Sequence, residues 1–259
     1  MSDKPNSPPA LQWALDGREV DLLHYIFNRS DIKQIRGNPA KVLNVIEEYH
    51  SQFKPLMNIG RVKGKFITDI IADRKPSMMI ELGGYIGYSA ILFGDTIRKN
   101  GGKQFLSIEK NPEMAAIATQ LVELAGLRDY VRIIIGASDE VLRELVTETR
   151  EIETVELIFI DHWQDRYRPD LWLLEELEVL KPGKSVLVAD NVIMPGAPAY
   201  LEWIHATPQE KKDIICKSEV GLLRPNPDLV YDSHVQVFQD TEFGRDGVAV
   251  THLKGTEGV

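Results

Sequence analysis

The run MMIELGGYIGYS, residues 78–89, has the composition of a nucleotide-binding turn. Glu81 ends a short apolar segment that predicts a strand, and three glycines follow it before a helix-like segment. Glycines let backbone N–H groups approach a polar ligand at a helix N-terminus, where the helix dipole adds to the attraction. The dinucleotide fingerprint G-x-G-x-x-G is not matched, because Tyr85 stands where the middle glycine would be. The pattern E-x-G-x-x-x-G fits S-adenosylmethionine (SAM) binding better, and an ordinary tight turn is the alternative.

A second acid, Glu109, ends the next predicted strand. Helix-like sequence separates this strand from the first one, so the unit is β-α-β. An acid at this position of a mononucleotide-binding fold accepts hydrogen bonds from ribose hydroxyls. Because Lys110, Asn111 and Pro112 also make a good helix start, a solvated glutamate before a turn is the alternative.

Two further strand ends carry side chains with oxygen ligands. One apolar run ends in Asp161, and another ends in Asp190 and Asn191. The carboxyl ends of parallel strands face one crevice, so these side chains are expected to converge. Two carboxylates and an amide oxygen suit Mg²⁺ better than Zn²⁺. Turn formation by the Asp-Asn pair before Pro195 is the alternative.

Alternating strands and helices must position these residues. The hydrophobic pattern predicts strands at 78–82, 104–109, 131–135, 155–161 and 185–190. It predicts helices at 20–28, 39–52, 61–74, 88–98, 112–125, 139–149 and 169–180. This order is typical of an α/β fold with a mostly parallel central sheet and helices on both faces.

The pattern changes after Asn191. A helix is expected at 199–206 and strands at 213–216, 234–238 and 248–253, which would close the sheet with an antiparallel hairpin. Residues 221–232, with two prolines, are expected to form a long loop over the open end of the sheet.

Composition limits the function classes. The chain has 259 residues, 43% of them hydrophobic, and a net charge of −9 without a long basic run, which argues against nucleic acid as a partner. The single cysteine, Cys216, excludes an internal disulfide and fits a reducing compartment. No apolar run has transmembrane length, so no membrane contact is expected. Residues 1–18 are expected to be disordered and 19–259 to form one domain, a cytoplasmic monomer.

Five motifs occur in order along the chain and are far more specific together than singly. They are ELGGYIGYSA, SIEKNP, the Gly136-Ala137-Ser138 turn, DHWQDRYRPD and ADNVIMPGAP. With them the chain resembles the catechol O-methyltransferase family, from about Met57 to about Lys254. The resemblance implies a Rossmann-like, SAM-dependent class I methyltransferase fold. It also implies Mg²⁺-dependent methyl transfer from SAM to a hydroxyl of a catechol-like acceptor.

The resemblance assigns roles to individual positions. The SAM-binding residues would be Ile59, Glu81, Gly83, Tyr85, Ser89, Glu109, Ser138, His162 and Trp163. The Mg²⁺ ligands would be Asp161, Asp190 and Asn191. Trp163 and Pro195 would flank the acceptor ring. The catalytic positions would be Asp161 and that of the family's lysine base, which is Gln164 here.

Three departures from the family pattern affect the chemistry. Gln164 cannot accept a proton at neutral pH, unlike the lysine it replaces. Pro55 replaces a tryptophan that helps to enclose the acceptor. The glutamate that binds the second catechol hydroxyl corresponds to Asp240, or to Gln236 if the alignment is made from the other side of the inserted loop.

Two alternatives to the methyltransferase prediction remain. A SAM-binding homologue with lost or redirected catalysis would explain Gln164 and Pro55. A nicotinamide-dependent oxidoreductase would use the β-α-β unit and Glu109, but it leaves Asp161, Asp190 and Asn191 without a role.

Overall fold

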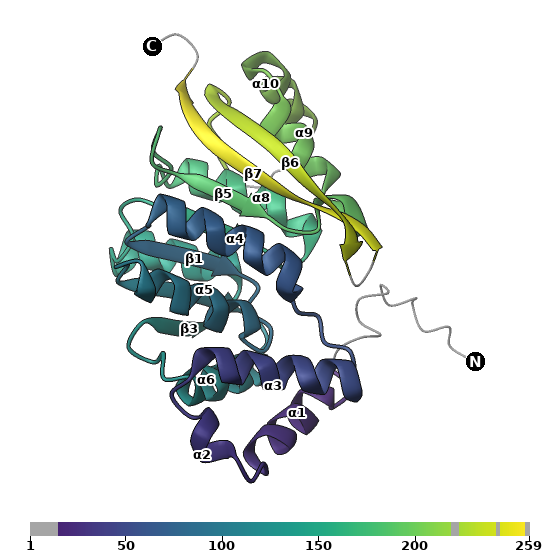
Figure 1. Cartoon of the computed structure of the whole chain (residues 1–259). Helices are drawn as coiled ribbons and strands as arrows, with labels where there is room; N and C mark the ends of the chain where they lie inside the picture. The colour runs from purple at the N-terminus through teal and green to yellow at the C-terminus, as the bar shows by residue number, and fades with distance from the viewer. Residues whose placement is uncertain (1–14, 219–222, 242–243, 257–259) are drawn as a thin grey trace, which may run out of the picture.

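A seven-stranded sheet forms the centre of the molecule (Figure 1). The structure, a computed structural model, describes residues 15–218, 223–241 and 244–256, except the side chains of residues 240 and 241. The strands lie in the order β3-β2-β1-β4-β5-β7-β6. Their bounds are β1 Met78–Leu82, β2 Gln104–Glu109, β3 Val131–Ile135, β4 Leu157–Ile160, β5 Val186–Ala189, β6 Leu229–Thr241 and β7 Gly244–Thr256.

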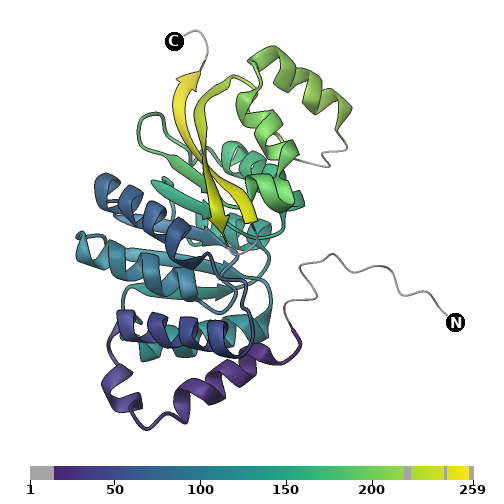
Figure 2. The ribbon, with the colours of Figure 1, turned by 45° about the vertical axis from the view of Figure 1, so that its right-hand side comes forward.

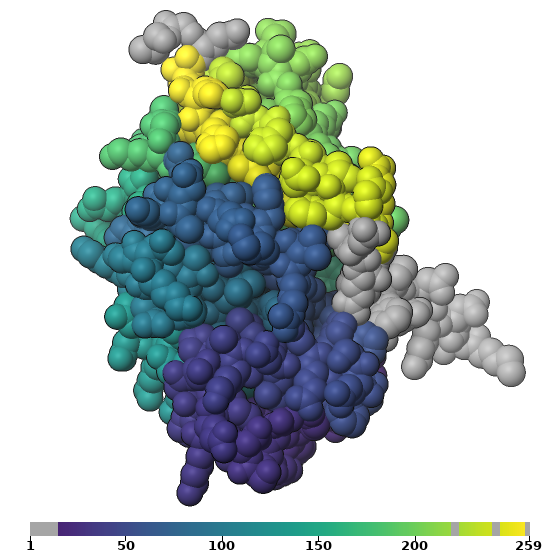
Figure 3. Space-filling model, in the orientation of Figure 1, coloured from purple at the N-terminus to yellow at the C-terminus, as the bar shows by residue number. Residues whose placement is uncertain are grey.

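The first five strands are parallel, and β7 is antiparallel to both of its neighbours. This arrangement confirms the predicted fold class, a mostly parallel sheet that closes with an antiparallel hairpin. The hairpin lies beside α4 (Gly60–Arg74), where Phe66 meets Phe238 with ring centroids 5.6 Å apart (Figure 3).

Alternate residues of each strand face two different cores, as the two-residue period of a strand requires. Met79, Phe105 and Phe159 join the core beneath one layer of helices. That layer contains α1 (Arg18–Phe27), α3 (Pro39–Gln52), α4, α5 (Tyr88–Lys99) and α6 (Pro112–Leu124), and α2 (Ile32–Ile35) connects α1 to α3.

Ile80, Leu106 and Ile158 face the opposite core. The second layer of helices covers it and contains α7 (Ser138–Arg143), α8 (Gln164–Glu176), α9 (Pro198–His205) and α10 (Pro208–Lys217). Figure 2 shows α4 and α5 on one side of the sheet and the green helices α9 and α10 on the other. Burial on both faces explains why β4 and β5 are uniformly apolar.

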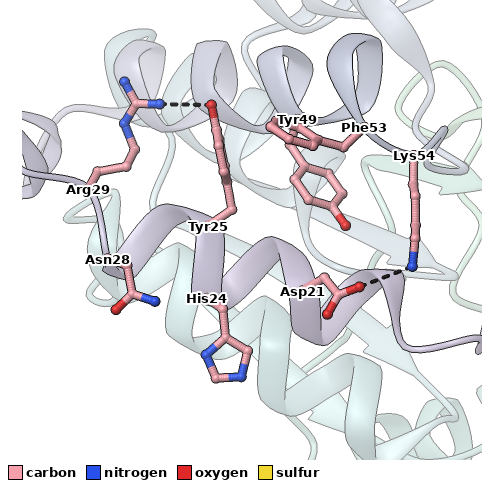
Figure 4. Close-up of a pocket in the computed structure, with 8 residues that line it drawn as sticks. All are labelled: Asp21, His24, Tyr25, Asn28, Arg29, Tyr49, Phe53 and Lys54. Atoms are coloured by element: carbon pink, nitrogen blue, oxygen red, sulfur yellow. Dashed lines mark hydrogen bonds and ion pairs between the residues drawn. The ribbon is translucent and has the colours of Figure 1, made fainter.

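Helices α1 and α3 pack through aromatic rings, and their outer surface is hollowed (Figure 4). Tyr25 lies 5.6 Å from Tyr49 and 5.0 Å from Phe53, measured between ring centroids. An ion pair of 3.0 Å joins Lys54 to Asp21 across the hollow. These contacts fix α1 on the body of the molecule.

Three expectations need correction. Residues 213–216 are helical, not a strand, because they belong to α10, which begins with a capping box of Thr207 and Glu210. Helix α8 begins at Gln164, before the expected 169, and includes Pro169. Residues 229–232 belong to β6, and the described loop before them packs on the end of α8, away from the carboxyl ends of the parallel strands. Residues 1–14 lie outside the described part of the chain.

Candidate active site

The carboxyl ends of four adjacent parallel strands bring the predicted residues together. Leu82 of β1 pairs with Ile108 of β2 and with Ile160 of β4, so the residues that follow these strands share one edge. In the same way Ile160 pairs with Ala189, which places Asp161 beside Asp190. This edge is where open α/β sheets bind ligands.

Backbone packing explains why the turn after β1 contains glycine. Gly83 has a φ of +95°, and a Cβ atom there would lie 2.4 Å from the backbone oxygen of Asp161. A side chain would therefore collide with the backbone that carries the proposed metal ligand. At Gly84 a Cβ atom would lie 2.4 Å from Oγ of Ser107. The close approach of β1, β2 and β4 at this turn thus requires glycines.

Glu81 is fully buried at the end of β1. One carboxylate oxygen, Oε2, accepts a hydrogen bond from Ser107, while Oε1 has no partner in the described structure. Burial raises the pKa of Glu81 to about 7 against the opposing hydrogen bonds of Ser107 and Ser89. A buried carboxylate oxygen without a partner is costly, and a cationic group of a ligand would satisfy it.

Glu109 holds the glycine turn as well as facing the site. Its Oε2 accepts the backbone N–H of Tyr85 at 2.8 Å, and its Oε1 accepts that of Asn111 at 2.7 Å. Burial raises the pKa of Glu109 although these backbone donors lower it. Each oxygen retains a second lone pair, so the carboxylate can also accept from a ligand hydroxyl.

Ser138 and His162 meet at one buried acid, Asp170 of α8. Oγ of Ser138 donates to Oδ2 of Asp170 at 2.5 Å, and Nε2 of His162 lies 2.6 Å from the same oxygen. Nδ1 of His162 is buried and has no partner among the described residues. Next to this group, Trp163 leaves 47% of its side chain exposed at the start of α8. The group offers polar atoms and a flat ring to a planar base.

Tyr85 links the glycine turn to the first helix. Its hydroxyl donates to Oε1 of Glu19, a buried residue of α1, at 2.7 Å. Burial raises the pKa of Tyr85, and the Glu19 carboxylate raises it further, so the phenol stays protonated. Ile59 precedes α4 and packs, like Tyr85, against the core under α1 and α3.

Asp161 and Asp190 form a charged pair with few protein partners. Asp161 makes no side-chain hydrogen bond within the described chain, and burial together with the nearby Asp190 raises its pKa well above the usual range. Asp190 accepts from Nζ of Lys63 at 2.7 Å and from the backbone N–H of Asn191 at 2.8 Å, both at Oδ1. Its Oδ2 is therefore left for another ligand.

Lys63 also binds Asp246, at 2.5 Å, so this lysine bridges two acids. Burial alone would lower the pKa of Lys63, but Asp190 and Asp246 reverse the effect and raise it. When Asp161, Asp190 and Asp246 are all ionised, their three negative charges face the one positive charge of Lys63, and the net charge is −2. A divalent cation would neutralise this cluster.

The donor set fits Mg²⁺. Asn191 uses its amide N–H groups on Asp246 and on the carbonyl of Met194, at 2.9 and 3.2 Å, so only its oxygen remains for a ligand. The unpaired oxygens are thus those of Asp161, Oδ2 of Asp190 and Oδ1 of Asn191, all hard ligands. No group of three His, Cys, Asp or Glu side chains within the described chain has metal-binding spacing, so the amide oxygen is needed to complete the set.

The structure gives few side-chain contacts for the remaining residues that the sequence analysis singled out. Gln164 is the first residue of α8, and its side chain makes no hydrogen bond within the described chain. Pro195 lies exposed in the turn Val192–Gly196, after a cis peptide bond. Asp240 lies in β6, but its side chain is outside the described set. The carbonyl of Pro55 accepts a hydrogen bond from Arg18.

Three residues of the site were missed from the sequence: Lys63, Asp170 and Asp246. Asp170 stands inside the motif DHWQDRYRPD, eight residues after His162, but His162 precedes α8, so no helical spacing links the two. Lys63 and Asp246 are 183 residues apart in the chain, and no local pattern pairs them.

Comparisons with known proteins agree with the geometry. A family model described as O-methyltransferase matches residues 38–252. Catechol O-methyltransferase of Bos taurus is 40% identical over 187 residues, which cover 72% of this chain and 66% of that protein. The Mus musculus enzyme of the same name is 41% identical over 171 residues, 66% of this chain and 63% of that protein. The chain thus spans slightly less than two thirds of these relatives' lengths.

The crystal structure of an O-methyltransferase from Bacillus cereus, in complex with S-adenosylhomocysteine (SAH), shares the fold. Its TM-score is 0.61 at 18% identity, and the match covers 94% of this chain and 99% of that one. Among the residues that the structure describes, no helix is long and apolar enough to cross a membrane.

Proposed function

Since this chain belongs to the O-methyltransferase family, we propose that it transfers the methyl group of SAM to a hydroxyl of a catechol-like acceptor, in a reaction that requires Mg²⁺. The observation that carries the proposal is a set of oxygens at the strand ends, from Asp161, Asp190 and Asn191, that have no partner among the described residues. Asp161 follows the strand next to the one that carries the buried free oxygen of Glu81, and Asp190 and Asn191 follow the strand after that.

The SAM site would follow the strand ends. Glu81 would bind the cofactor's ammonium group through its free Oε1, and Glu109 would accept from the ribose hydroxyls. Ser138, His162 and Trp163 would surround the adenine. SAM supplies a methyl group already activated by its sulfonium, so these residues need only hold it in line with the acceptor oxygen.

Asp161, Asp190 and Asn191 would hold Mg²⁺, with the acceptor ring between Trp163 and Pro195. A bound divalent cation favours the ionised form of a hydroxyl and fixes its direction. With SAM bound, the acceptor oxygen would attack the methyl carbon, and the electron pair of the broken carbon–sulfur bond would return to sulfur to give SAH. The hydroxyl proton is lost to water, because Gln164 cannot take it.

A second candidate is a SAM-binding homologue whose chemistry is lost or redirected. The observation that favours it is Gln164, which stands where the family has its base and has no acid–base partner within the described chain. A positioned base contributes roughly 10²–10⁴ in rate. The first candidate therefore predicts a slow enzyme and the second predicts none.

The test is SAH formation from SAM with a panel of catechols, with Mg²⁺ and with EDTA. We expect turnover that EDTA reduces at least about 100-fold. Asp161→Asn should reproduce this loss, whereas Asp69→Asn, at an exposed ion pair with Lys65, should not. Binding of SAM without turnover of any catechol would favour the second candidate.

A further inference from the structure

Asp246 has an unusually complete set of donors for a residue outside the proposed ligand set. It is 2% exposed in β7, and its Oδ2 accepts from Nζ of Lys63 and from Nδ2 of Asn191. Its Oδ1 accepts the backbone N–H groups of Ile193 and Met194, at 3.3 and 2.9 Å. All four partners are donors, so only an ionised carboxylate satisfies them.

One of these hydrogen bonds, from Nδ2 of Asn191, helps to determine which atom of Asn191 faces the proposed metal site. An amide can flip and present either NH₂ or oxygen, and only the oxygen can bind a cation. The contact of Nδ2 with Asp246 fixes one orientation, and the contact of Nδ2 with the carbonyl of Met194 supports it. Asn191 has a positive φ of 55°, so its backbone is held as well.

The two backbone hydrogen bonds to Oδ1 of Asp246 fix the turn Val192–Gly196, which carries Pro195. Oδ1 of Asp246 receives two successive N–H groups of that turn. Met194 is 53% exposed, so the turn has little apolar packing of its own at that position. One carboxylate therefore anchors both a proposed metal ligand and the turn beside the proposed acceptor.

Lys63 completes the arrangement from α4. Its ammonium contacts Oδ1 of Asp190 and Oδ2 of Asp246, so it holds the two acids together without using Oδ2 of Asp190. Lys63 thus neutralises one negative charge and leaves Oδ2 of Asp190 free for the proposed metal ion.

We propose that Asp246 is a positioning residue, with Lys63 as its counter-ion, that fixes the Asn191 oxygen and the turn Val192–Gly196 before the metal ion binds. This inference rests on the proposed function, since it assumes a divalent cation at Asp161, Asp190 and Asn191. Partners that orient metal ligands typically change metal affinity 10–100-fold when they are mutated.

The experiment measures Mn²⁺ binding by electron paramagnetic resonance, in the presence of SAH and without acceptor. The isosteric variant Asp246→Asn replaces two acceptor oxygens by one oxygen and one NH₂ group, which faces other donors. We expect its Kd for Mn²⁺ to rise at least about tenfold, while its Kd for SAH stays within about twofold of the wild-type value.

The matched control is Glu175→Gln. Glu175 is also a buried carboxylate with several donors, from Trp203, Tyr231 and the backbone of Asn226, but it lies at the far end of α8. We expect the wild-type Kd for Mn²⁺ in this variant. An equal loss of affinity in both variants would mean general destabilisation and would overturn the positioning role.

The outcomes separate this inference from the proposed function. If the wild-type protein binds Mn²⁺ and Asp246→Asn binds it equally well, only the positioning role is wrong. If the wild-type protein binds SAH but no Mn²⁺, the metal-dependent reaction and the positioning role are both wrong.

A second measurement on the wild-type protein does not depend on the folding of Asp246→Asn. The side-chain NH₂ resonance of Asn191 can be assigned by its loss in Asn191→Asp. We expect slow exchange of these protons with solvent before any metal is added, because both contacts of Nδ2 already exist. Exchange at the rate of a free amide would overturn the proposal.

Discussion

Gln164 is the residue at which this chain departs most from the chemistry its family predicts. It begins α8, is partly buried, and makes no side-chain hydrogen bond within the described chain, so its replacement breaks no such contact. We expect Gln164→Lys to raise kcat with a catechol by roughly 10²–10⁴, the contribution of a positioned base. Single-turnover SAH formation measures this gain.

The matched control is Gln209→Lys, in the first turn of α10 and away from the strand ends. It adds the same charge and should leave kcat unchanged. Equal rates for the wild-type protein and Gln164→Lys would mean that proton transfer to this position no longer limits the reaction.

Glu175 gives a pH prediction that does not involve the site. Burial raises its pKa to about 7, although Tyr231 and Trp203 donate to it. Between about pH 4.5 and 7 the folded state keeps this proton while the unfolded chain loses it, so the free energy of unfolding falls as pH rises. The shift corresponds to a loss of up to about 3 kcal/mol across this window.

Glu175→Gln removes this group from the titration. We expect urea unfolding at pH 5 and pH 7.5 to show a smaller fall in unfolding free energy for the variant than for the wild-type protein. The pKa of Glu81 is raised in both proteins, so its contribution to the pH dependence cancels in the difference. Identical pH slopes would contradict the raised pKa.

At the residue scale, the sequence predicted the acids at the strand ends better than it predicted the residues that contact them. Glu81, Glu109, Asp161 and Asp190 end strands, and strand ends can be identified from local hydrophobic pattern. Lys63 reaches the site from α4, and its contact with Asp246 depends on the packing of a helix against a strand near the other end of the chain. Such pairings are tertiary and have no local signature.

At the element scale, the sheet and most of its helices were predictable, while the region after Asn191 was less so. The five parallel strands are apolar runs separated by helices of ordinary length, and both signals agree. Residues 213–216 are apolar enough for a strand, but the capping box at Thr207 and Glu210 starts a helix that includes them. The strand propensity of four residues stabilises a strand less than a cap and ten residues stabilise a helix.

Helix α1 makes a contact with the proposed SAM site that can be tested. Glu19 accepts from the hydroxyl of Tyr85, which follows Gly84 in the turn. Glu19→Ala leaves this buried hydroxyl without its charged acceptor and loosens the turn. We expect the Kd for SAH, measured by calorimetry, to rise about tenfold, which corresponds to about 1.4 kcal/mol.

The same pair of helices supplies the control. Glu48 of α3 accepts from the hydroxyl of Tyr25 and from Arg29, two residues that line the hollow shown in Figure 4. Glu48→Ala removes a comparable tyrosine–glutamate contact and should leave SAH binding unchanged. An equal rise in the Kd for SAH in both variants would show that α1 affects SAH binding only through overall stability.

At the scale of the whole molecule, the two cores and the site share one sheet. Binding at the strand ends therefore stabilises the structure that both helix layers pack against. The single domain at 19–259, the monomer and the cytoplasmic location stay predictions. Stability, by contrast, can be linked to the proposed ligands directly.

A ligand at 100 times its Kd stabilises the folded state by about 2.7 kcal/mol, and a chain of this size gains roughly 2–4 °C in Tm per kcal/mol. We expect SAH to raise the Tm of the wild-type protein by roughly 5–10 °C at that concentration. Mg²⁺ added with SAH should raise it further, because the cation neutralises the −2 charge of Asp161, Asp190, Asp246 and Lys63.

Addition of SAH and Mg²⁺ should reverse which of two proteins is the more stable, Asp161→Asn or the wild-type protein. Without ligands, Asp161 and Asp190 repel each other in a buried setting, so the neutral variant should melt at the wild-type temperature or above it. With SAH and Mg²⁺ the wild-type protein should melt higher, since the variant has lost a carboxylate ligand but keeps Glu81 and Glu109 for SAH. Thermal scans of both proteins, with Asp69→Asn as the control for an exposed acid, measure this crossing. The same Mg²⁺ increment in Asp161→Asn and in the wild-type protein would place the cation elsewhere and remove Asp161 from the metal site.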